Sequence, residues 1–266
     1  MKFLWHPDFA GIENTYLLFI GTLKLDGRKN IEFRIIAKDN YRFYINREEK
    51  VFGPARFAPL YPEYSTINME LDNGEHEIAC VVHQYGIDTR FSDRNVPCFF
   101  LCEIAEGDII YDIEFKVAHL DCYIDLKKRN NPLLGWMEFI DCRKLWDENN
   151  NIGRLVFKEC VEIDYKYEQI RKQSIHDVKD MPVHVKSVDS GVFIDRFGYA
   201  NDNPAVRFMM RDLKTKFQPK GVWKRFDLGY IGLYRPEIIV KAPEGTIMET
   251  GYASFMFQDR VNPVIE

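Results

Sequence analysis

The sequence predicts an all-β protein built from two tandem antiparallel β-sandwich units of the jelly-roll type, with few short helices. Short apolar runs alternate with a period of two, as expected for half-buried strands. Turn residues (Asp, Asn, Gly and Pro) separate these runs at short, regular spacing, which is typical of sandwiches. Aromatic residues make up 14% of the chain, including 20 Phe and 14 Tyr, and such side chains pack well on a pleated sheet.

The clearest strand pattern lies in residues 41–85. Tyr41, Phe43 and Ile45 fall on one side of an extended run, and the residues between them fall on the other side. Further strands are expected at residues 67–71 and 77–83. The turn Asp72-Asn73-Gly74 separates them, because Asn and Gly tolerate the positive φ of a tight hairpin. Residues 53–62 contain Gly53 and three prolines, which predicts a surface loop.

The rest of the first unit follows the same pattern. Residues 16–20 form an apolar run too continuous for an exposed edge strand, and Trp5 is expected to anchor the preceding arm on the sandwich. The other strands are expected at residues 16–25, 31–37, 98–104 and 109–117, the last two forming a hairpin. Residues 86–97 are polar and predict a loop.

The second domain is expected to begin with an irregular connecting region, residues 126–180. This region contains possible strands at residues 135–141 and 155–163 and a possible short helix at 165–173. Strands of the second sandwich are expected at residues 183–188, 191–197, 206–211, 221–228, 237–241 and 247–253. The predicted domains are therefore residues 1–125 and 126–266.

Composition excludes several partners and compartments. The net charge is −5 and no Lys/Arg-rich run is present, so nucleic acid and membrane are not expected partners. No apolar run reaches the roughly 20 residues that span a bilayer. The N-terminus lacks a signal peptide's apolar core. The six cysteines lie scattered, mostly in apolar runs, which favours buried free thiols in a reducing compartment and a cytoplasmic location.

Motifs for metals, cofactors and nucleophilic catalysis are not found. The histidines lack the spacing of zinc ligands on a helix, and no C-x-x-C is present. Cys98 and Cys102 would lie about 13 Å apart on a strand. Loop carboxylates such as Asp88 and Asp93 leave a calcium site open, although solvated loop charges explain them more simply. No metal ligand, cofactor or catalytic residue is assigned.

Four blocks of sequence carry a resemblance to a known family. They read YRFYINREEKVFGPARFAPLY from Tyr41, GEHEIACVVHQYG from Gly74, GWMEFIDCRK from Gly135 and WKRFDLGYIGLYRPEIIVKAPEGT from Trp223. In this order and spacing they resemble the N-terminal β domains of bacterial α-L-rhamnosidases. The resemblance implies galactose-binding-like sandwich units. In this chain, Arg47 stands at the position of the glycine in the family's Asn-Gly turn.

The resemblance implies a glycoside hydrolase without its catalytic part. The family's two-carboxylate hydrolysis takes place on a helical (α/α) barrel that follows the β domains, and no long helical pattern occurs in this sequence. The chain is therefore expected to support such a barrel, in cis or in trans, and to bind carbohydrate such as a rhamnose-containing glycan. A stand-alone carbohydrate-binding module and a structural module that docks a separate catalytic chain remain alternatives.

A carbohydrate site is predicted at one end of the first sandwich. Sugars stack on aromatic rings while polar groups bind their hydroxyls. The candidate residues are Arg56, Tyr61, Tyr64, His83, Tyr85 and Arg90. A competing interpretation is structural: Tyr61 and Tyr64 would cap the core, and Arg56 would bind backbone carbonyls of its loop.

Overall fold

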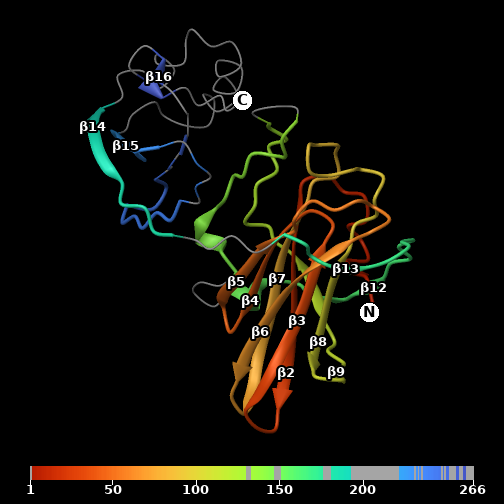
Figure 1. Cartoon of the computed structure of the whole chain (residues 1–266). Coiled ribbons are helices and arrows are strands. Elements are labelled where there is room, and N and C mark those ends of the chain that lie inside the picture. Colours follow the sequence, from red (N-terminus) through yellow and green to blue (C-terminus); the bar gives the residue numbers. More distant parts are fainter. Residues whose placement is uncertain are drawn as a thin grey trace. The chain divides into compact units, whose positions relative to one another are not determined.

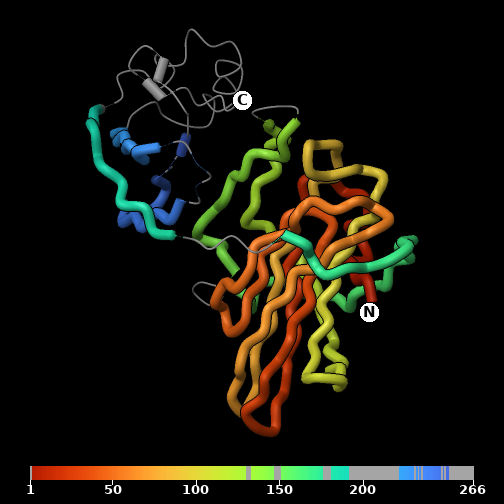
Figure 2. Tube along the Cα trace, viewed as in Figure 1, coloured from red at the N-terminus to blue at the C-terminus, as the bar shows by residue number. Residues whose placement is uncertain are grey.

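The computed structural model describes residues 2–129, 133–146, 151–175, 181–192 and 222–230, together with residues 232, 234, 236–246, 248, 250–251, 256–257 and 260–261. The chain divides into two compact units, Met1–Asp177 and Val178–Glu266 (Figures 1 and 2). Each unit is described by itself.

The first unit is a β-sandwich of two sheets, as the sequence predicts. One sheet has the order β12-β1-β8-β3-β6-β13, with β9 paired to β8, and the other has the order β11-β10-β2-β7-β4-β5. The strands are β1 (Leu4–Trp5), β2 (Thr15–Leu25), β3 (Lys29–Ala37), β4 (Asn40–Ile45), β5 (Glu48–Gly53), β6 (Glu63–Leu71), β7 (Gly74–Gln84), β8 (Phe100–Glu106), β9 (Ile109–Tyr111), β10 (Lys116–His119), β11 (Lys158–Glu159), β12 (Val161–Glu162) and β13 (Arg171–Lys172). Their pairing is antiparallel except between β13 and β6.

The predicted alternation in β4 is confirmed. Tyr41, Phe43 and Ile45 are almost completely buried between the sheets, whereas the residues between them are half-buried on the other face. β2 and β7 pair over their full length, from Thr15–Gln84 to Leu25–Gly74. These long central strands, visible in Figure 1, form the rigid base on which the other elements lie.

Burial on both faces of the strand explains the continuous apolar run in β2. Leu17 and Phe19 point into the inner core, while Tyr16 and Leu18 belong to a second cluster on the outer face of the six-stranded sheet. Trp146 covers that face. A third cluster covers the outer face of the seven-stranded sheet; its buried members are Phe3, Ile36, Val96, Phe99, Leu101 and Tyr165.

The N-terminal arm is anchored as predicted. Trp5 has no exposed surface, and its indole Nε1 donates to the carbonyl of Phe9 at 3.1 Å. The buried indole thus holds both β1 and the turn that follows it. This contact fixes the position of residues 6–9, which matters for the pocket described below.

The turn between β4 and β5 holds Arg47 in a backbone conformation that favours glycine. Asn46 and Arg47 both have positive φ, at 51° and 67°, as a two-residue type I′ hairpin turn requires. Asn46 also accepts a hydrogen bond from the Glu77 backbone N–H through its side-chain oxygen at 3.0 Å. The hairpin adds β5, a strand that the sequence analysis did not predict.

Several predicted elements differ in the structure. Residues 135–141 form no strand and make only the isolated bridge Tyr123–Ile140. Residues 165–173 form no helix; they are extended and end in β13 beside β6. The predicted strand 109–117 is divided between β9 and β10, which lie in different sheets, and the strand 155–163 between β11 and β12. In each case contacts with a sheet edge or outer face, which are distant in sequence, override the local pattern.

Residues 126–175, assigned by the sequence analysis to the second domain, include three strands that join sheets of the first unit. These are β11, β12 and β13. Two 3-10 helices, η1 (Cys142–Lys144) and η2 (Asn151–Arg154), lie in the same stretch. In the part of the chain that the structure describes, no helix is long and apolar enough to cross a membrane.

The described part of the second unit contains two small antiparallel sheets. β14 (Lys186–Val192) pairs with β15 (Val222–Asp227), and β16 (Met256–Phe257) pairs with β17 (Arg260–Val261). An ion pair joins Arg225 to Asp189 across β14 and β15. The predicted strand 221–228 matches β15. Residues 237–241 are not a strand, and the predicted strand 206–211 lies outside the described residues.

A candidate ligand pocket in the first unit

The six predicted carbohydrate-binding residues do not form one cluster of contacts. Tyr61 binds Glu168 through its hydroxyl, and the Arg171 guanidinium lies 4.3 Å from the centre of its ring. Tyr64 packs against the outer cluster of the seven-stranded sheet. Arg56 is exposed and makes no hydrogen bond or ion pair with the described residues, so it does not bind the carbonyls of its loop.

His83 and Tyr85 lie in a different place, within a buried stack of rings on the six-stranded sheet. We call Tyr123, Tyr16, His83 and Tyr85 the aromatic ladder. The Tyr16 ring lies between Tyr123, at 3.7 Å between centroids, and His83, at 3.8 Å. Tyr85 meets His83 edge-on. His83 and Tyr85 are only 5% and 9% exposed, so neither ring offers a face to a sugar.

A covering segment completes the burial of the aromatic ladder. Glu138 accepts a hydrogen bond from the Tyr16 hydroxyl at 3.3 Å. The Trp136 indole donates to the Tyr85 carbonyl at 2.8 Å. Gly135 lies so close that an added Cβ would be 2.6 Å from the Tyr85 ring. Residues 135–138 therefore act as a lid fixed over the rings.

The ladder is electrically neutral at physiological pH. Burial, reinforced by the nearby Arg42 charge, lowers the pKa of His83 to about 3. Burial and the negative charge of Glu138 raise the pKa of Tyr16 far above its usual value. Desolvation of the charged form dominates both shifts. These rings therefore stabilise the sheet rather than exchange protons.

In the polar loop around Arg90, hydrogen bonds to backbone groups hold the loop in shape. The Arg90 N–H donates to the Leu133 carbonyl at 2.9 Å. Asp88 accepts from the Arg94 N–H at 2.9 Å, and Asp93 accepts from the Asn95 N–H at 2.9 Å. These carboxylates shape turns. Among the described residues, no three His, Cys, Asp or Glu side chains are placed to hold a metal ion.

A pocket of about 370 Å³ lies elsewhere in the first unit, among residues that the sequence analysis did not single out. It is formed by the N-terminal arm, the end of β10, η1, η2 and the start of β11. Its lining residues are His6, Asp8, Phe9, His119, Asp121, Lys144, Asn151, Arg154, Leu155, Val156 and Lys158.

Two stacked rings form the aromatic part of this pocket. Phe9 and His119 lie 4.6 Å apart with planes only 10° from parallel. His6 meets Phe9 edge-on at 4.7 Å. Both Phe9 and His119 are half-buried, so part of the stack stays accessible. The hydrogen bond from the Trp5 indole to the Phe9 carbonyl holds this arrangement in place.

The two histidines of the pocket are neutral at pH 7. Burial lowers the pKa of His6 and of His119. His6 Nδ1 accepts the Asp8 backbone N–H at 3.1 Å, which assigns the ring proton to Nε2. A neutral His6 therefore has a defined tautomer, and at 3% exposure its ring belongs to the packed wall of the pocket.

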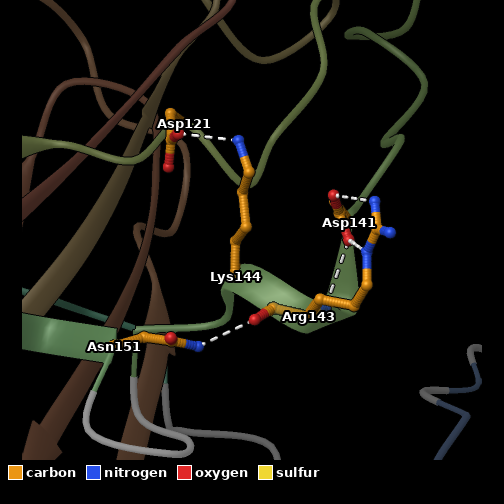
Figure 3. A network of polar contacts seen from close by, with 5 residues as sticks. All are labelled: Asp121, Asp141, Arg143, Lys144 and Asn151. Atoms are coloured by element: carbon orange, nitrogen blue, oxygen red, sulfur yellow. Dashed lines mark hydrogen bonds and ion pairs between the residues drawn. The ribbon is translucent and has the colours of Figure 1, made fainter. Parts of the chain in front are cut away.

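Ion pairs frame the pocket. Lys158 binds Asp8. Lys144 binds Asp121 at 2.8 Å, as Figure 3 shows. The hydrogen bond from Lys158 lowers the pKa of Asp8. A general acid for glycoside hydrolysis needs a raised pKa instead. Asp8 therefore lacks the raised pKa of such an acid.

A network of hydrogen bonds places η1 and η2 beside the pocket. Asp141 caps η1 and pairs with Arg143, which lowers the pKa of Asp141 to about 2. The buried Asn151 donates from Nδ2 to the carbonyls of Arg143 and Leu145 at 3.0 and 2.9 Å. Figure 3 shows this link from η2 to η1 and the Lys144 side chain reaching to Asp121.

One sequence signal could have pointed to this pocket. His6-Pro7-Asp8 and His119-Leu120-Asp121 share the spacing H-x-D, and each pair lies at the end of a short strand. The spacing alone is too common to be convincing. The fold brings the two pairs together.

Comparison with solved structures supports the fold class. The chain is similar to a GH78 family rhamnosidase of Bacillus sp. GL1, with a TM-score of 0.53 and 16% identity, over 73% of this chain and 21% of that one. Weaker likenesses include an α-L-rhamnosidase from Dictyoglumus thermophilum (TM-score 0.43, 12% identity, 73% and 23% covered). A lectin from Pleurotus ostreatus, solved in complex with GalNAc, is also similar (TM-score 0.36, 10% identity, 60% and 42% covered).

The first of these likenesses shows a shared fold, and the chain spans about a fifth of that rhamnosidase's length. No family model and no curated protein matches the sequence. The protein is thus an all-β sandwich protein, similar in fold to part of a GH78 rhamnosidase.

Proposed function

We propose that this chain is a non-catalytic, carbohydrate-binding β-sandwich region of an α-L-rhamnosidase-like glycoside hydrolase. The observation that carries the proposal is the accessible Phe9–His119 stack inside a pocket framed by ion pairs. The likeness in fold to part of a GH78 rhamnosidase supports it. Hydrolysis belongs to a helical barrel, in cis or in trans, and the cytoplasm is the proposed location.

The pocket supplies both kinds of contact that a sugar needs. The apolar C–H face of a sugar ring packs on an aromatic face, and here the Phe9–His119 stack provides one. Hydroxyl groups around the ring find acceptors in Asp8 and Asp121 and a donor in Lys144. A volume of about 370 Å³ lies at the small end of ligand pockets, which suits a short glycan end.

Phe9→Ala tests this proposal. The full chain is titrated with L-rhamnose and D-galactose while chemical shifts are followed by NMR. Loss of the stacking ring is expected to weaken binding about tenfold, the change that roughly 1.4 kcal/mol of lost contact produces. Phe91→Ala is the matched control, because Phe91 is 63% exposed in the polar loop and should leave sugar binding unchanged.

Two other results bear on the same proposal. An aryl rhamnoside should not be hydrolysed by the purified chain, and turnover that co-purifies with it would contradict a non-catalytic role. Equal binding by the wild type and the Phe9→Ala variant would move the sugar site elsewhere and remove the reason for this assignment.

A structural docking role is a second candidate, favoured by one edge of the first unit. Ile109 and Ile110 in β9 are 60% and 61% exposed, and in the described part of the chain β9 pairs only with β8. A catalytic barrel chain could cover these residues. Ile110→Lys should then weaken association with a co-expressed barrel, measured by analytical ultracentrifugation, without affecting sugar binding.

A further inference from the structure

The charges lining the pocket do not balance. Three cationic side chains, Lys144, Arg154 and Lys158, face two carboxylates, Asp8 and Asp121. Each lysine is paired with one of the carboxylates. None of the described residues forms an ion pair or hydrogen bond with the Arg154 side chain. Because both histidines are neutral at pH 7, the pocket carries one positive charge in excess.

Arg154 is held at the pocket by buried contacts of its own helix. Asn151, at the other end of η2, is only 4% exposed and donates two hydrogen bonds to the backbone around η1. Ile152 and Leu155 pack against the cluster on the outer face of the six-stranded sheet. The backbone that carries Arg154 is therefore fixed, although its side chain is exposed.

We propose that the pocket selects an acidic sugar, with a uronate carboxylate on Arg154 and the sugar ring on the Phe9–His119 stack. This inference rests on the proposed carbohydrate-binding function and adds the ligand class. A guanidinium matches a carboxylate through two parallel hydrogen bonds. The single excess charge matches a monoanion.

A dianion fits the pocket less well. The carboxylates of Asp8 and Asp121, each paired with a lysine, would repel the second negative charge of a phosphate group. A neutral sugar would offer Arg154 no carboxylate, and none of the described residues supplies one. The stack of rings, in turn, gives no advantage to a small inorganic anion, which has no apolar face. Only a ligand that combines a ring and one carboxylate uses both features.

The test compares D-galacturonate with D-galactose, which differ by a carboxylate in place of a hydroxymethyl group. Titration of the full chain at low salt, followed by NMR, should show galacturonate binding about tenfold more tightly. Arg154→Gln should remove this preference. Arg94→Gln is the matched control, because Arg94 is exposed in the loop of residues 86–97 and should keep the preference. Arg154→Lys, which keeps charge but loses the planar fork, should retain part of it.

The outcomes separate this inference from the proposed function. Equal affinity for the two sugars, or a preference that survives Arg154→Gln, overturns acidic-sugar selection while carbohydrate binding stands. Sodium acetate or inorganic phosphate binding as tightly as galacturonate means that the site recognises an anion alone, which also overturns it. Failure of both sugars to bind overturns the proposed function as well. An unchanged thermal midpoint for each variant confirms that folding does not cause the effect.

Discussion

Two groups of histidine and aromatic side chains on the same six-stranded sheet have opposite accessibility. The aromatic ladder around His83 is sealed beneath residues 135–138. The pocket around His119 leaves a half-buried stack of rings open to a ligand. Both histidines are neutral because burial lowers their pKa. The comparison shows that residue types alone do not distinguish a structural cluster from a binding site.

Strand position explains the difference. His83 is in β7, which pairs along its length with β2 on one side and with β4 on the other. His119 ends β10 and pairs there with Leu17 of β2, while β11 reaches only Lys116 and Val117. Among the described residues, one side of His119 therefore has no neighbouring strand. The arm that carries His6 and Phe9 packs against His119, and the pocket lies beside them.

The largest expected effect comes from removing the central ring of the aromatic ladder. Tyr16→Ala should lower the free energy of unfolding of the full chain by about 3–5 kcal/mol, because a fully packed ring leaves a cavity between Tyr123 and His83. Urea denaturation followed by tryptophan fluorescence measures it. Tyr16→Phe, which loses only the hydrogen bond to Glu138, should cost about 0.5–1.5 kcal/mol. Similar values for the two variants would contradict the packing argument.

The second effect is on the pH dependence of the free energy of unfolding, which the protonation of His83 should control. Its pKa is about 3 in the folded protein and about 6.5 when unfolded. The unfolded state therefore binds more protons below pH 6.5, and stability falls by up to about 1.4 kcal/mol per pH unit as the pH drops from there towards 3. Denaturation midpoints between pH 7 and 5 measure this slope.

His83→Gln is the comparison variant for that slope, because it removes the titrating group. It should be less stable at pH 7 but show a flatter profile from pH 7 to 5. The buried Asp39 affects stability in the opposite direction, because desolvation raises its pKa in the folded protein. The stability that protonated Asp39 contributes is lost as the pH rises above about 3.8, the value in the unfolded chain. If the slope is the same with and without His83, another group causes it.

A smaller effect tests the lid over the aromatic ladder. Gly135→Ala should destabilise the protein by about 1–3 kcal/mol, because the new Cβ meets the Tyr85 ring at 2.6 Å. Gly153→Ala in η2 is the control: apart from its own neighbours along the chain, no atom of the described residues lies within 4 Å of its Cβ position, so the change should stay within about 0.5 kcal/mol. Equal effects would mean that residues 135–138 do not pack tightly on Tyr85.

The sequence by itself determined the sandwich through the alternation in its long strands. Tyr41, Phe43 and Ile45 could be placed in the core because period-two burial is a local property. The turn at residues 72–74 was predicted from residue chemistry for the same reason. The six free cysteines in the structure agree with the prediction of free thiols, although Cys142 is exposed rather than buried.

Only the tertiary structure decided which polar aromatic residues are open to solvent. His83 and Tyr85, predicted to bind sugar, are covered by residues far along the chain. His6 and His119 were not singled out, because their meeting depends on an arm fixed by Trp5 and on an edge where β11 ends. Local periodicity records which side of a strand a residue faces. It carries no information about what covers that side, because covering segments such as residues 135–158 are irregular and are positioned by long-range contacts.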